Sequence, residues 1–127
     1  KKKKIDSTKM LSDIVQKINK YKFKHPATRV FQALRIVINE ELNELEEALK
    51  ISLEILTKNS RIVIVAFHSL EDKIVKNFFK KNGYQNFNGD NKNGFRIITK
   101  KPITPSLEEI NINPRSKSAK LRVAQKI

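Results

Sequence analysis

Cysteine is absent from the 127 residues, and glycine occurs only three times. Without cysteine the chain has no disulfide framework and no thiolate zinc site, and its two histidines alone do not predict a structural metal. The three glycines lie in or beside residues 83–94, so no glycine-rich turn that would hold a nucleotide cofactor follows a strand. The serine motif G-x-S-x-G is also missing, which argues against a hydrolase of that type.

Long apolar runs are missing too. No run approaches the roughly 20 residues that cross a bilayer, and no apolar segment typical of a signal peptide follows the lysine-rich start. We therefore expect a cytoplasmic protein without a membrane partner. The length suits one domain with a hydrophobic core.

Positive charge is in large excess. The chain carries 27 Lys and Arg against 13 Asp and Glu, a net charge of +14, so a polyanion is the first partner to consider. Residues 1–24 hold nine Lys and two Asp, residues 38–56 one Lys and six Glu, and residues 96–127 eight Lys and Arg and two Glu. This basic, acidic, basic order indicates basic surfaces on a folded body rather than a simple charged tail.

Helical periodicity dominates the first half of the chain. Ser7 or Asp6 is expected to cap a short amphipathic helix. Residues 25–56 form the longest helical region, with Pro26 at its first helical position. That length is unusual for one helix in a globular protein, so we predict a break near residues 39–42 and two consecutive helices.

A strand is predicted directly after these helices. Residues 62–67 are all apolar and rich in β-branched side chains, which is typical of a strand buried on both faces of a parallel sheet. The polar residues 57–60 join it to the preceding helix. A helix, a short joint and such a strand imply an earlier strand of the same sheet, and residues 1–29 show none.

A second helix signal follows the strand. Ser69 is predicted to cap a helix, with Asp72 three positions later completing an S-x-x-D capping box. Apolar residues recur at helical spacing as far as Phe79, and Asn82-Gly83 is expected to end the helix.

The turn between strand and helix is the best candidate site. Ligands of open α/β sheets bind beyond the carboxyl ends of strands, where this chain places polar side chains. The candidates for the substrate side of a catalytic site are His68, Ser69, Glu71 and Asp72. The alternative interpretation is that Ser69 and Asp72 only cap the helix while Glu71 is solvated and His68 bonds a neighbouring loop.

The last third of the chain reads as short elements. We expect a loop at residues 84–94, a strand at 95–99, a helical turn capped by Ser106 with Glu109, a basic polar loop at 113–118, and an exposed or edge strand at 120–127. Between residues 100 and 120, cations alternate with small hydroxyl residues, which suits contact with phosphates, although solvated charge explains the pattern equally well. The candidate RNA contacts are Lys100, Lys101, Arg115, Lys117 and Lys120.

Three stretches together resemble a known family. They are HPATRVFQALRIVINEEL at 25–42, FHSLEDKIVK at 67–76 and TKKPITPSLEEININPRSKSAKLRVAQKI at 99–127. In this order they resemble the C-terminal part of the ribosomal RNA small subunit methyltransferase H family. The resemblance implies an S-adenosylmethionine-dependent enzyme that methylates the N4 of a cytidine in small-subunit (16S) rRNA. The alternative is a non-catalytic basic RNA-binding fragment or remnant.

The resemblance also implies an architecture. The fold class is α/β, the C-terminal part of a class I, Rossmann-like methyltransferase domain, with residues 1–24 as the end of an inserted helical domain and residues 25–127 belonging to the methyltransferase domain. It implies that the strands at 95–99 and 120–127 form an antiparallel edge. The family's cofactor residues lie in a half that this chain does not contain, so no S-adenosylmethionine ligand is assigned here and the chain alone is expected to be inactive. We assign His25 and Arg29 to positioning at the junction of insert and sheet.

Overall fold

The computed structural model describes residues 4–19, 25–83 and 94–127. It divides into two compact units, one ending at Glu41 and the other beginning at Leu42. The domain boundary predicted after residue 24 borders residues outside the described ranges and stays a prediction.

The first unit contains the helices α1, Thr8–Ile18, and α2, Ala27–Ile38. The Ser7 side chain accepts a hydrogen bond from the Met10 amide at 3.2 Å, which confirms a predicted cap of α1. Helix α2 begins one residue later than predicted, because Pro26 occupies the cap position. The His25 ring atom Nδ1 accepts from the Ala27 amide at 3.3 Å and so satisfies one free donor at the helix start.

The predicted break after α2 is confirmed. Asn39 ends α2, Glu40 has a positive φ of 51°, and α3 runs over Glu41–Ile55. A left-handed residue cannot continue a right-handed helix, so the chain turns here. The exposed Arg35 side chain pairs across this break with Glu41, with Nε 2.8 Å from a carboxylate oxygen.

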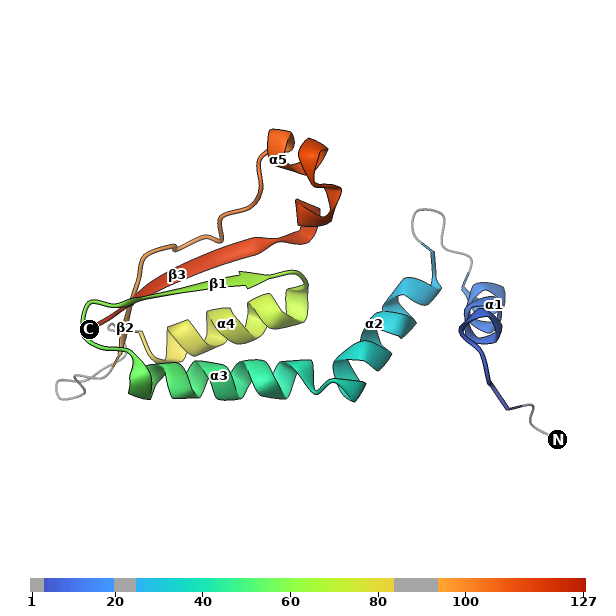
Figure 1. Cartoon of the computed structure of the whole chain (residues 1–127), viewed down its shortest axis with the longest axis horizontal. Helices are drawn as coiled ribbons and strands as arrows, with labels where there is room; N and C mark the ends of the chain where they lie inside the picture. Colours follow the sequence, from blue (N-terminus) through green and yellow to red (C-terminus); the bar gives the residue numbers. More distant parts are fainter. Residues whose placement is uncertain (1–3, 20–24, 84–93) are drawn as a thin grey trace. The chain divides into compact units, whose positions relative to one another are not determined.

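The second unit is built on a three-stranded sheet in the order β1-β3-β2 (Figure 1). The strands are β1, Arg61–Ala66, β2, Phe95–Ile97, and β3, Lys120–Lys126, and both pairings are antiparallel. An antiparallel arrangement of β2 and β3 agrees with the resemblance. The prediction of an exposed or edge strand at 120–127 was wrong, because among the described residues β3 pairs with β1 on one side and with β2 on the other.

The two faces of the sheet differ in burial. On β1, Ile64 and Ala66 face the helices, while Val63 and Val65 on the opposite face are 57% and 46% exposed. Among the described residues β1 pairs only with β3, so the prediction of a strand buried on both faces of a parallel sheet was wrong for this structure. The apolar run predicted the strand correctly, but it did not predict which strands pair with β1 or in which direction.

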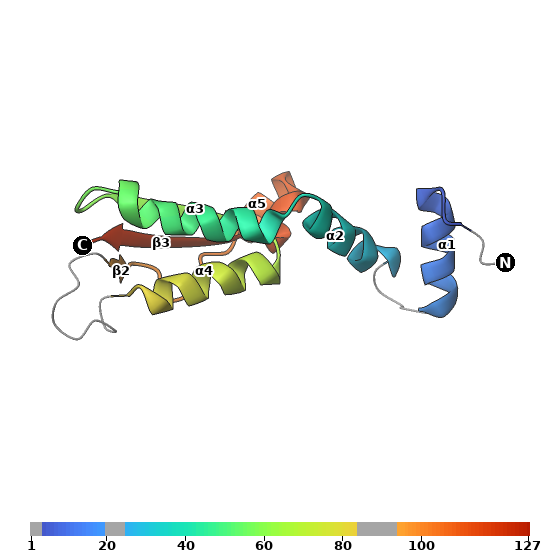
Figure 2. The same cartoon turned by 90° about the horizontal axis from the view of Figure 1, so that it is seen from below.

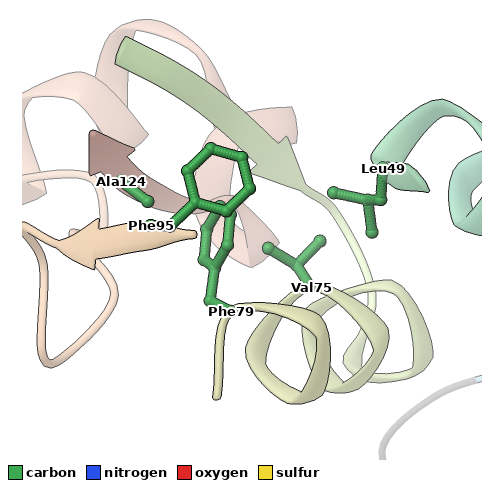
Figure 3. Packing of buried hydrophobic residues seen from close by; sticks show 5 residues of the cluster. All are labelled: Leu49, Val75, Phe79, Phe95 and Ala124. Atoms are coloured by element: carbon green, nitrogen blue, oxygen red, sulfur yellow. The ribbon is translucent and has the colours of Figure 1, made fainter. Parts of the chain in front are cut away.

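Helices α3 and α4, the latter spanning Ser69–Lys81, cover the same face of the sheet (Figures 1 and 2). The core between them and the strands contains Leu49, Val75, Phe79, Phe95 and Ala124 (Figure 3). The rings of Phe79 and Phe95 meet edge to face with their centroids 5.6 Å apart. Burying each ring contributes about 2 kcal/mol, so this pair fixes β2 on α4.

The connections follow local chemistry. Asn82 ends α4, as predicted, and residues 84–93 of the predicted loop lie outside the described residues. Ser106 caps α5, Leu107–Ile112, by accepting from the Glu109 amide at 3.1 Å, which confirms that prediction. The predicted polar loop at 113–118 is instead a 3-10 helix, Pro114–Ser118, since Pro114 favours a helical start.

No helix among the described residues is long and apolar enough to span a membrane.

Candidate functional site

The turn after β1 is held by a capping box one residue earlier than the sequence predicted. His68 is the cap: its Nδ1 accepts from the Glu71 amide at 3.3 Å. The Glu71 carboxylate in return accepts from the amides of His68, at 3.2 Å, and Phe67, at 2.8 Å. The prediction that Ser69 and Asp72 form the box was wrong, because His68 has the extended backbone that a cap requires and Ser69 is already helical.

The other ring nitrogen of His68 lies in a buried position. Nε2 is 3.2 Å from a Glu71 carboxylate oxygen, but the alignment does not make a hydrogen bond, and Nε2 has no partner within the described ranges. Because Nδ1 accepts a hydrogen bond, Nε2 carries the proton in the neutral ring. The His68 side chain is only 9% exposed, so this N–H has lost water without gaining a bond.

Asp72 joins the helix to the central strand. Its carboxylate accepts from Arg122 Nε at 2.7 Å and from Lys120 Nζ at 3.2 Å. The hydrogen bond from Arg122 lowers the pKa of Asp72 below its ordinary value, burial opposes this, and the bond from Lys120 lowers the pKa further. Asp72 is therefore ionised at neutral pH.

The four substrate-side candidates of the turn differ in how far their side chains are already engaged by other residues. His68 and Glu71 close the capping box, and Asp72 balances two cations. Ser69 is exposed, as is the neighbouring Phe67, whose exposed fraction is 56%. Ser69 is thus the candidate with a side chain accessible to a ligand.

The five candidate RNA contacts differ in exposure and in pairing. Lys100 and Lys101 are exposed on the segment between β2 and α5, and Arg115 and Lys117 are exposed on the 3-10 helix. Lys120 differs because it is paired with Asp72 and only 38% of its side chain is exposed.

The two positioning candidates lie in the first unit. His25 lies two residues before the start of α2, where its ring accepts from the Ala27 amide, and Arg29 is exposed in the first turn. Their assignment to a junction between insert and sheet stays a prediction.

Sequence reasoning missed Arg122, which is 8% exposed. The signal was present in the alternation of β3, which places Arg122 on the same face as Ala124 and Lys126 and opposite Leu121 and Val123. Its role depends on Asp72, which no local pattern connects to it.

Comparison with known proteins identifies the family. The family model described as the MraW methylase family matches residues 1–127. The chain belongs to this family. Similar proteins include three named Ribosomal RNA small subunit methyltransferase H.

Their similarity covers nearly all of this chain. The protein from Sulfurihydrogenibium sp. (strain YO3AOP1) is 51% identical over 100% of the chain and 42% of its own length. That from Leptospira interrogans serovar copenhageni is 49% identical over 96% and 36%, and that from Wolbachia sp. (strain wRi) is 47% identical over 100% and 42%. The chain spans about two fifths of the length of the relatives it matches.

Proposed function

We propose that this chain is the C-terminal, substrate-side portion of an S-adenosylmethionine-dependent enzyme that methylates the N4 of a cytidine in small-subunit rRNA. The observation that carries the proposal is the match of the whole chain to the MraW methylase family, with relatives at about half identity named for methylation of this RNA. A net charge of +14 supports an RNA substrate.

The proposed architecture follows from the same membership. Residues 25–127 belong to a Rossmann-like methyltransferase domain, and residues 1–24 are the end of a helical insert. The exposed apolar side chains of β1, Val63 and Val65, support this placement, because such a face is usually covered in a large α/β domain.

The described residues do not fit an S-adenosylmethionine site. Such a site needs glycines that let the backbone approach the cofactor, and the turn after β1 has none. Gly83 instead follows a helix, where a Cβ would lie 2.8 Å from the Phe79 carbonyl oxygen, so its lack of a side chain is required by the helix end. We assign no cofactor ligand to this chain.

The substrate side requires orientation of a poor nucleophile. The lone pair of a cytosine N4 amino group is delocalised into the ring, so the enzyme must hold that group in line and accept its proton. We assign to the Ser69 hydroxyl a hydrogen bond to the base and to the exposed Phe67 ring a stacking contact. His68 and Glu71 hold the turn that presents both residues, and Asp72 fixes that turn to β3.

The test is methyl transfer by the full product of the gene. Radiolabelled S-adenosylmethionine and small ribosomal subunits are the substrates, and mass spectrometry of the digested rRNA locates N4-methylcytidine. Ser69→Ala is expected to lower kcat at least tenfold with unchanged thermal melting, whereas Ser118→Ala, an exposed serine on the 3-10 helix, leaves it unchanged. Absence of methylated cytidine in the small-subunit rRNA would contradict the proposal.

The alternative function is a non-catalytic basic RNA-binding module. The exposed cations of η2, Pro114–Ser118, favour it as much as they favour the enzyme. A gene product that binds small-subunit rRNA but transfers no methyl group would support this alternative. A glycine-rich turn after a strand, encoded upstream of Lys1, would favour the enzyme.

A further inference from the structure

A basic pocket lies at the C-terminal end of α4, whereas the turn after β1 lies at the start of this helix. A pocket of about 520 Å³ opens between the C-terminal half of α4 and strands β2 and β3. Among the residues that the structure describes, ten line it, of which five are cationic and none is acidic. The cations are Lys76, Lys80, Arg96, Lys100 and Arg122. None of these residues belongs to the turn after β1.

The walls of the pocket are apolar and firmly packed. Phe79 and Phe95 are 2% and 0% exposed, so their rings are engaged in the core and offer no free face to a base. Gly83 also lines the pocket, at the helix end where a Cβ would lie 2.8 Å from the Phe79 carbonyl oxygen. A ligand therefore meets cationic side chains over a fixed apolar wall.

Much of this positive charge has no counter-ion among the described residues. Asp72 balances Arg122 through its bond to Nε. Lys76, Arg96 and Lys100 make no ion pair with any residue of the three described ranges. Like charges gathered around one pocket repel each other, and a bound anion removes that repulsion.

We propose that this pocket binds the phosphodiester backbone of single-stranded RNA. The planar guanidinium of Arg96 suits two oxygens of one phosphate, and Lys76 and Lys100 add point charges. The volume lies within the range of pockets that hold small ligands, which suits one or two nucleotides rather than a duplex. Because neither Phe79 nor Phe95 has a free face, the described lining recognises the backbone and not the base sequence.

This inference rests on RNA as the partner in the proposed function, but not on methyl transfer. The pocket cations come from α4, from β2 and the segment after it, and from β3, so the charges meet only in the folded unit. The pocket thus adds a phosphate contact to the strip of exposed cations at Arg115 and Lys117.

The test compares two double variants of the full gene product. Arg96→Ala with Lys100→Ala removes two pocket cations, and Lys58→Ala with Lys73→Ala removes two exposed cations outside it that also lack ion pairs within the described ranges. Binding to a labelled single-stranded RNA of about 12 nucleotides is measured by fluorescence anisotropy at several salt concentrations. The pocket pair is expected to lower the log–log salt slope by about 1.4, since each lost single-strand contact contributes about 0.7.

The control pair is expected to change the slope much less, because it alters only the long-range field. Equal effects of the two pairs would overturn the proposal, since net charge would then explain both. Arg96→Lys, which keeps the charge, should retain the slope and lose part of the affinity, while thermal melting checks that each variant is folded.

If the pocket pair behaves like the control while the protein still methylates rRNA, the pocket inference fails and the proposed function stands. If the protein transfers no methyl group but the double variant of the pocket shows the expected lower salt slope, the proposed function fails and the pocket inference stands.

Discussion

The Asp72 carboxylate accepts a hydrogen bond of 2.7 Å from Arg122 Nε across 50 residues of sequence, and both side chains are buried. This pair joins the first turn of α4 to the central strand of the sheet. Lys120 adds a second contact to the same carboxylate at 3.2 Å. The turn that carries Ser69 is therefore fixed at both of its ends, by the capping box and by this ion pair.

We predict that Asp72→Ala destabilises the protein by about 3 kcal/mol, because it leaves Arg122 buried without its counter-ion. The measurement is urea unfolding of wild type and variant. Glu54→Ala, which removes an exposed carboxylate from α3, is the matched control and should change the free energy of unfolding by less than about 0.5 kcal/mol. Equal effects of the two substitutions would show that the buried pair contributes nothing specific.

The same pair predicts a pH dependence. The pKa of Asp72 is lowered in the folded protein, so its stabilising contribution is complete above the unfolded value of about 3.9 and is lost as pH falls through the folded pKa. The difference in unfolding free energy between wild type and Asp72→Asn should be constant above about pH 5 and should shrink below about pH 4. A difference that grows on acidification would contradict the assignment.

His68 is predicted to act through capping. His68→Ala should lower stability by about 1 kcal/mol, whereas His68→Asn, which also accepts from the Glu71 amide, should restore most of it. Thermal melting measures this, and methyl transfer by the same variants separates the roles. If His68→Asn is stable but inactive, the imidazole itself takes part in the reaction.

Local features of the fold were predictable from the sequence, because they depend on residues three or four positions apart. Ser7 and Ser106 cap their helices as predicted, and the break between α2 and α3 lies within the expected residues. The cap of α4 was misplaced by one position, because both His68 and Ser69 carry an acceptor and the sequence does not reveal which backbone is extended.

Features that depend on distant residues were not predictable. The central position of β3 and its antiparallel pairing with β1 are set by tertiary packing, and a short alternating strand looks the same at an edge or in the middle. For the same reason the sequence placed Lys120 among the RNA contacts, while the structure pairs it with Asp72. The basic pocket was missed because Lys76, Arg96 and Lys100 come from separate segments.

Lys117 and Lys120 should now behave differently. Lys117 is exposed, so Lys117→Ala is expected to lower the salt slope of rRNA binding by about 0.7 to 0.9. Lys120→Ala should leave the slope nearly unchanged and lower the melting temperature, because it removes a contact to Asp72. Filter binding over a range of salt concentrations and thermal melting measure the two effects, and an unchanged slope for Lys117→Ala would remove that residue from the interface.

The central claim is that this chain supplies the substrate side of the enzyme and no cofactor site. Isothermal titration with S-adenosylmethionine tests it most directly, on the 127-residue chain and on the full product of the gene. We expect micromolar binding by the full product and no measurable heat from the chain alone, because the described residues form no cofactor site. A methyl-transfer assay on small ribosomal subunits, run on both samples, should show turnover only by the full product. Micromolar cofactor binding or turnover by the 127 residues alone would contradict the account.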